Sequence, residues 1–133
     1  MINRRHIRVK VMQSAYAMHR SNSSDIDKEL KFLKHSVQKM FDLYALNLLL
    51  IVEVQDLARK RIELSKKKIL ATTQDLKPNT KFIDNRLIAV IKDSVSLEGF
   101  AELNKLNNWS LDDEYVRIVW EELEESDLLN IFS

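Results

Sequence analysis

Apolar residues recur at helical spacing over most of the chain, beginning with residues 4–19. The apolar stripe of this segment consists of Ile7, Val11, Ala15 and Met18, with Ser14 beside it. The side chains on the opposite side are His6, Lys10, Gln13 and Arg20, with Arg5 and Tyr16 at the flank. This spacing predicts an amphipathic helix whose stripe packs inward. The polar run 21–24 ends it, and Ser24 with Asp27 forms a capping-box pattern for the next helix.

Residues 25–71 contain no helix-breaking residue. A straight helix of this length would reach about 70 Å at 1.5 Å per residue, whereas a compact domain of this size has a radius of gyration of about 14 Å. We therefore expect the stretch to kink, break or protrude, with a break near Phe41 and Asp42, where Asp42 can cap a second segment. Residues 45–52 are apolar on nearly every side, which predicts the most buried part of the fold.

A connection is expected over residues 72–79, which contain Pro78. Shorter helices should follow within residues 80–133: one over 81–92, one over 97–106 capped by Ser96, and one opened by a Ser110 and Asp113 capping box. In the last of these, the residues expected to face inward are Tyr115, Ile118, Val119 and Leu123. A final amphipathic turn is expected over 127–132, and the apolar ending suggests a piece of a longer protein.

Gly99 and Pro78 are the only glycine and proline among the 133 residues. Hairpins need such residues at their turns, and phosphate-binding loops need several glycines close together. The composition therefore predicts a single all-α domain over residues 1–133, a helical bundle of about five to seven helices. There is no cysteine and no apolar run of about 20 residues, and residues 1–5 lack the apolar run that a signal peptide would have. We expect a soluble cytoplasmic protein without a membrane partner.

The residues offer little for catalysis. The three histidines are scattered, no helix pairs them at metal-ligand spacing, and there is no cysteine or recognisable serine nucleophile. The acids Asp112, Asp113 and Glu114 fit the first turn of a helix, where negative charge complements the dipole. We therefore expect no enzyme, no cofactor and no metal site.

The net charge of +1 hides an asymmetry. The first cations, which meet no acid before Asp25, are Arg4, Arg5, Arg8, Lys10 and Arg20. Two further basic groups, 59–61 and 66–68, are interpreted as a solvated helix end, and the acidic stretch 121–125 as a solvated side of a helix. Positive charge in the first turns of a helix opposes the helix dipole, and contacts to phosphates would offset that cost.

The first helix also carries Tyr16, on which a base could stack, and Gln13, which can donate and accept hydrogen bonds. The candidate RNA-binding residues are Arg4, Arg5, Arg8, Lys10, Gln13 and Tyr16. From charge alone, an ordinary basic surface helix with Tyr16 packed inward explains the pattern equally well.

The segment Asn3-Arg4-Arg5-His6-Ile7-Arg8-Val9-Lys10-Val11-Met12-Gln13-Ser14-Ala15-Tyr16 resembles the opening helix of the bacterial transcription antitermination factor NusB. The matching residues are Arg4, Arg5, Arg8, Gln13 and Tyr16. The continuation through residues 42–44 to 107–112 resembles the long variety of that family, in which a large helical segment follows the opening helix. The glycine-bearing segment of the family's second half is absent, so the chain resembles the front part of such a protein.

This resemblance implies an all-helical protein that acts in ribosomal-RNA transcription. Its partners would be boxA-like RNA, the ribosomal protein NusE and the RNA polymerase antitermination complex. The matched arginines would contact phosphates or bases, with Gln13 and Tyr16 on or near the RNA surface. The alternative is a helical protein-interaction scaffold without RNA binding. The sequence leaves open the oligomeric state, a homo-oligomer included, and the exact RNA sequence.

Overall fold

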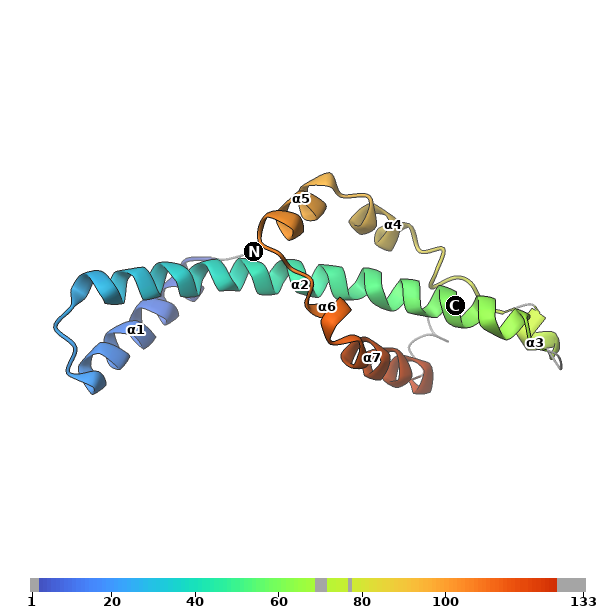
Figure 1. Cartoon of the computed structure of the whole chain (residues 1–133), viewed down its shortest axis with the longest axis horizontal. Helices are drawn as coiled ribbons and strands as arrows, with labels where there is room; N and C mark the ends of the chain where they lie inside the picture. Colours follow the sequence, from blue (N-terminus) through green and yellow to red (C-terminus); the bar gives the residue numbers. More distant parts are fainter. Residues whose placement is uncertain (1–2, 69–71, 77, 127–133) are drawn as a thin grey trace. The chain divides into compact units, whose positions relative to one another are not determined.

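A computed structural model of the chain describes residues 3–68, 72–76 and 78–126. These residues form helices without any strand, which confirms the expected all-α fold (Figure 1). The helices are α1 (Arg4–Ser21), α2 (Ile26–Lys66), α3 (Thr73–Leu76), α4 (Arg86–Lys92), α5 (Val95–Leu103), α6 (Asn108–Leu111) and α7 (Asp113–Glu125). The number of described helices lies within the expected range, and none is both long and apolar enough to cross a membrane.

The chain divides into two compact units, Met1–Ala45 and Leu46–Ser133. Helix α2 contributes its first half to unit one and its second half to unit two. Each unit therefore contains a different part of the same 41-residue helix.

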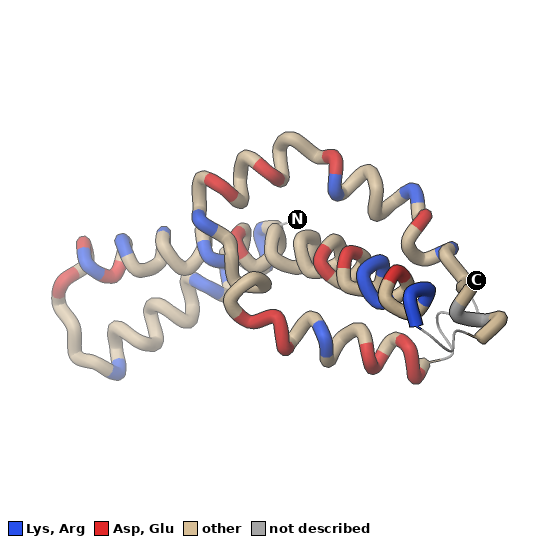
Figure 2. Tube along the Cα trace, turned by 45° about the vertical axis from the view of Figure 1, so that its right-hand side comes forward, with Lys and Arg blue, Asp and Glu red and all other residues tan. Residues whose placement is uncertain are grey.

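Unit one is a helical hairpin in which α1 lies antiparallel to the first half of α2 (Figures 1 and 2). The turn depends on Asn22, whose φ of 52° places it in the left-handed region that asparagine tolerates. The next helix takes its cap from Asp25, because the Oδ1 of Asp25 accepts a hydrogen bond of 3.0 Å from the Lys28 amide. The cap predicted at Ser24 is therefore wrong by one residue.

The break predicted near Phe41 and Asp42 is also wrong, since α2 runs through both residues. Asp42 does not cap a helix but lies buried within one, and its Oδ2 accepts a 2.7 Å ion-pair contact from the Lys39 Nζ one turn earlier. Because this pairing offsets the cost of burying a carboxylate, Asp42 is compatible with a continuous helix.

The core of unit two is built where α2 meets α7 and the turn before α4. Its buried apolar residues are Val54, Ala58, Ile83, Val116 and Trp120. The Trp120 ring lies 5.7 Å from that of Phe82, centroid to centroid, at a tilted angle. On α7, Val119 and Leu123 are half-buried as predicted, whereas Tyr115 and Ile118 are exposed. The predicted inward positions on α7 were therefore half correct.

The most buried part of α2 also differs from the prediction. Within residues 45–52 only Ala45 is buried, the four leucines are half-buried, and Ile51 is exposed. The fully buried positions come later, at Val54, Gln55 and Ala58. An all-apolar segment gives no information on which side faces the core, and the core side is set by partners distant in sequence.

Polar contacts tie α2 to the rest of unit two. The indole Nε1 of Trp109 donates to the Leu46 carbonyl at 2.8 Å, and the Gln55 side chain donates to the Ile83 carbonyl. Lys92 at the end of α4 pairs with Asp56 at 2.7 Å. These contacts hold α4 and α6 against α2 where the helices themselves are short.

The later helices begin at positions other than the predicted ones, and α4 starts at Arg86 instead of residue 81. Asn85 caps α4 after a turn over residues 81–84, and Ser94, not Ser96, caps α5. Ser110 lies inside α6, and α7 begins after Asp112 without a side-chain cap, so the predicted capping box with Asp113 is wrong. The amphipathic turn expected over 127–132 lies outside the described residues.

Candidate nucleic-acid interface

The candidate interface begins with the way α1 is capped. The Asn3 side chain accepts a 3.1 Å hydrogen bond from the His6 amide, and the Asn3 amide donates to the His6 Nδ1 at 3.2 Å. Capping boxes usually place Glu or Gln at the position that His6 occupies. The imidazole of His6 occupies that position here, so the helix is capped without an acid in its first turn.

The charge of α1 is consequently one-sided. Figure 2 shows Lys and Arg along this helix and no Asp or Glu. The cations of α1 are Arg4, Arg5, Arg8, Lys10 and Arg20. None of these five side chains forms an ion pair with any residue that the structure describes. Four of them, all but Arg20, lie in the first two turns, near the helix end where the dipole disfavours positive charge. The helix therefore carries an uncompensated positive potential.

The side of α1 that packs against α2 is marked by the buried Ser14, with Lys10 and Met18 half-buried one turn before and after it. This differs from the predicted stripe, because Ile7, Val11 and Ala15 are exposed. A small serine at the contact allows two helices to approach closely, which moves the packed side toward it. Lys10, predicted on the solvent side, is thereby drawn to the edge of the packed side.

The outward side of α1 carries Arg5, Arg8, Met12 and Tyr16, at intervals of three and four that align side chains along one side of a helix. Tyr16 is 66% exposed, so the alternative in which it packs inward is wrong for the described structure. Arg4 and Gln13 are also exposed and lie on either side of this line. Five of the six candidate residues are thus accessible together, and Lys10 is the exception.

Sequence reasoning overlooked Met12, which is 67% exposed between Arg8 and Tyr16. A methionine at helical spacing from apolar neighbours is more often part of a core, so no pattern distinguished it. In the structure it completes a surface in which cations precede an apolar and aromatic segment. That arrangement suits a ligand with both phosphates and flat apolar faces.

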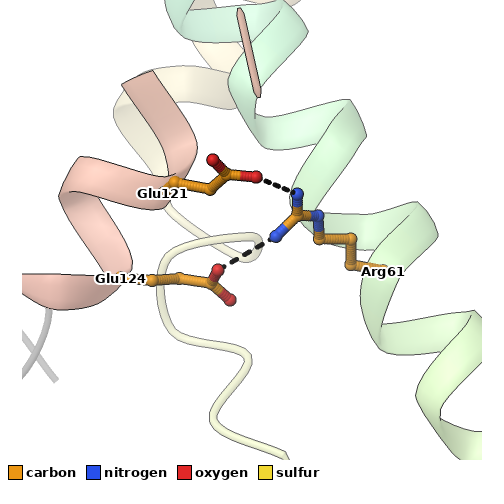
Figure 3. A network of polar contacts seen from close by, with 3 residues as sticks. All are labelled: Arg61, Glu121 and Glu124. Atoms are coloured by element: carbon orange, nitrogen blue, oxygen red, sulfur yellow. Dashed lines mark hydrogen bonds and ion pairs between the residues drawn. The ribbon is translucent and has the colours of Figure 1, made fainter. Parts of the chain in front are cut away.

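The basic residues at 59–61 and 66–68 differ from those of α1, because one of them forms ion pairs. Arg61 reaches two carboxylates of α7, with its Nη2 3.0 Å from Glu121 and its Nη1 3.1 Å from Glu124 (Figure 3). Arg59, Lys60 and Lys66 remain exposed on α2. Because two carboxylates neutralise Arg61, these residues form a weaker positive surface than α1.

A hollow in unit two carries charged side chains of both signs among its described residues. It is lined by α2 and α7 around Trp109, and its charged lining residues are Glu53, Asp56, Lys60, Asp113 and Arg117. Mixed charge of this kind suits a solvated groove. Among the described residues, no three histidine or acidic side chains come together as metal ligands would.

Comparison with known proteins adds no assignment: no protein-family model, curated protein or solved structure matches the chain.

Proposed function

We propose that this protein binds single-stranded RNA through α1, as a NusB-like transcription antitermination factor acting on boxA-type RNA with NusE. The observation that carries the proposal is the outward side of α1, where Arg5, Arg8 and Tyr16 are exposed together and no acid compensates the cations. Cations that release condensed counterions and a ring that stacks on bases are the two ingredients of single-strand binding. The resemblance of this helix to the opening helix of NusB supports the same assignment.

In this mechanism the arginines bind the phosphate backbone and set the position of the strand. The distance from Arg4 to Tyr16 along the helix is about 18 Å at 1.5 Å per residue, enough for several nucleotides of a site of about 4 to 16. Tyr16 stacks on one base, and Gln13 is placed to contact a base edge. Phosphate contacts position an RNA but carry no sequence information. We therefore expect weak, sequence-tolerant binding by this chain, with boxA preference requiring NusE or further protein surface.

The test is a fluorescence anisotropy titration of a labelled boxA-like RNA at several salt concentrations. Arg4→Ala with Arg5→Ala should lower the salt slope by about one to two units, because each phosphate contact contributes roughly 0.7 for single strands. The matched control is Lys66→Ala with Lys67→Ala, which removes the same charge at the C-terminal end of α2 and just beyond it, and should affect binding less. Unchanged affinity in the α1 double variant would show that α1 does not bind RNA.

Stacking is tested separately at Tyr16. Tyr16→Ala should weaken binding by about 1 to 3 kcal/mol, and Tyr16→Phe should retain most of it, because stacking needs the ring alone. Competition between boxA and a scrambled RNA, with and without NusE, then tests specificity. If the chain alone preferred boxA over the scrambled RNA by more than about a hundredfold (about 2.7 kcal/mol), this would contradict the expectation that boxA preference requires NusE or further protein surface.

A protein-interaction scaffold is the second candidate, favoured by the exposed Ile7, Val9 and Val11 on α1. Exposed apolar side chains of this size are typical of a surface that docks another protein. The two functions differ in their response to salt, since apolar docking barely depends on ionic strength whereas phosphate binding does. A pull-down with NusE that survives high salt in the absence of RNA would support the scaffold.

A further inference from the structure

Helix α7 has an outward side that no described residue covers. Its inward side is occupied by Val116 and Trp120, which are buried in the core of unit two. Away from these buried positions, Tyr115 is 62% exposed and Ile118 is 47% exposed. Because these two side chains are three residues apart on one helix, they lie next to each other and form a small exposed apolar surface.

Acids surround this apolar pair. Glu114, Glu122 and Glu125 are exposed and form no ion pair within the described chain. Glu121 and Glu124 are partly neutralised by Arg61, and Arg117 is the single cation on α7. Figure 2 shows acidic positions toward both ends of α7. The outward side of α7 is therefore an apolar centre with an uncompensated acidic rim.

The outward side of α1 has the opposite character. Met12 and Tyr16 form its apolar centre, with Arg5 and Arg8 before them and Arg20 after them. The two surfaces also match in length. From Arg5 to Tyr16 is 11 residues, about 17 Å at 1.5 Å per residue, and Tyr115 to Glu125 covers 10 residues, about 15 Å.

We propose that α1 of one copy of this protein docks antiparallel on α7 of a second copy. In that register, four outward residues of α1 meet four outward residues of α7, because in both helices these residues are spaced three or four positions apart. The pairs brought together are Arg5 with Glu125, Arg8 with Glu122, Met12 with Ile118, and Tyr16 with Tyr115. Cations near the α1 N-terminus then face the negative end of the α7 dipole, which favours this direction over the parallel one.

The occupant is a second copy because the chain carries both complementary surfaces. An apolar centre with oppositely charged rims fixes register and direction, and like charges in any other register oppose it. Each copy offers one basic and one acidic surface, so the contact can close a pair or extend from copy to copy. The contact needs no RNA and does not rest on the proposed function. If α1 also binds RNA, self-association and RNA compete for the same side of α1.

The test is charge reversal with complementation, followed by analytical ultracentrifugation of nuclease-treated protein. Arg5→Glu with Arg8→Glu on α1, and Glu122→Arg with Glu125→Arg on α7, should each weaken self-association by more than about tenfold through like-charge contacts. An equimolar mixture of the two variants should associate again, because each reversed surface meets a surface of opposite sign. The controls are Lys66→Glu with Lys67→Glu, and Glu98→Arg with Glu102→Arg, which change net charge equally elsewhere and should leave association intact.

Three results would overturn the proposal: a wild-type chain that stays monomeric at high concentration, reversals that leave association unchanged, or a mixture that fails to associate. Circular dichroism of each variant checks that its helices are retained. The RNA arm separates this inference from the proposed function. Glu122→Arg with Glu125→Arg should bind labelled single-stranded RNA at least as tightly as wild type, because α1 is released. RNA binding without self-association refutes only the docking of α1 on α7, and self-association without RNA binding refutes only the proposed function.

Discussion

The indole of Trp109 donates its hydrogen bond to the carbonyl of Leu46, 63 positions earlier in the chain, at 2.8 Å. The other tryptophan of unit two behaves differently: the Nε1 of Trp120 is buried and has no hydrogen-bond partner among the described residues. Trp109 thus fastens α6 to α2 by a directed polar contact, whereas Trp120 contributes by apolar packing against Phe82.

Trp109→Phe should therefore destabilise the protein by at least about 1 kcal/mol, the net contribution of one hydrogen bond. Trp120→Phe keeps a ring beside Phe82 and loses no hydrogen bond, so its cost reflects lost volume alone. Urea denaturation followed by circular dichroism measures both. A Trp109→Phe variant as stable as wild type would mean that the contact with Leu46 contributes nothing.

The fold class was predictable because it depends on composition. With one glycine and one proline, the chain lacks the turn residues of sheets, and its periodicity favours helices throughout. The extent of α1 was predictable for the same reason, since the polar run after His19 ends the pattern within two residues of the observed end.

Which side of each helix packs inward, and at which residue each helix begins, were harder to predict. Lys10 and Ser14 lie toward α2 although more apolar neighbours were available, because a close helix approach favours a small residue. The same limit applies at Asp42, where an ion pair with Lys39 replaces the expected cap. Side-chain chemistry permits a cap at Ser94 or Ser96 equally, and in the structure Ser94 caps α5.

Overpacking at Ala58 tests the core of unit two. Ala58 lies on α2, and its side chain is fully buried in the core of unit two. Ala58→Leu should cost about 1 to 3 kcal/mol, because extra methylenes force neighbouring side chains from their rotamers. The next residue supplies the control: Arg59→Leu places the same side chain at an exposed position and should change the unfolding free energy by less than about 0.5 kcal/mol.

The caps give a second test of the backbone. Ser94→Ala and Asn85→Ala should each cost about 0.5 to 2 kcal/mol, because both side chains accept hydrogen bonds from helix amides. Ser96→Ala and Ser110→Ala, at the positions favoured by sequence alone, should be close to neutral. Thermal melts of the four variants suffice, and equal losses at Ser94 and Ser96 would contradict the observed start of α5.

The Arg61 fork should be weak and sensitive to salt. Both carboxylates are about half exposed, and exposed ion pairs contribute about 0.2 to 1 kcal/mol each. A double-mutant cycle of Arg61→Ala with Glu124→Ala should give a coupling in that range at low salt that decreases at 1 M salt, where the screening length is about 3 Å. A coupling that salt does not change would indicate a contact shielded from solvent.

The sharing of α2 between two units has a consequence for the order of folding. Unit one is completed by residues up to Ala45, and its two helices are neighbours in sequence. Unit two must join Leu46 to Trp109 and Arg61 to Glu124, both separated by 63 positions. Local contacts form faster than distant ones, and chains fold from the N-terminus as they are synthesised. The hairpin that presents the basic side of α1 is thus expected to form on the ribosome while α7 has yet to be translated.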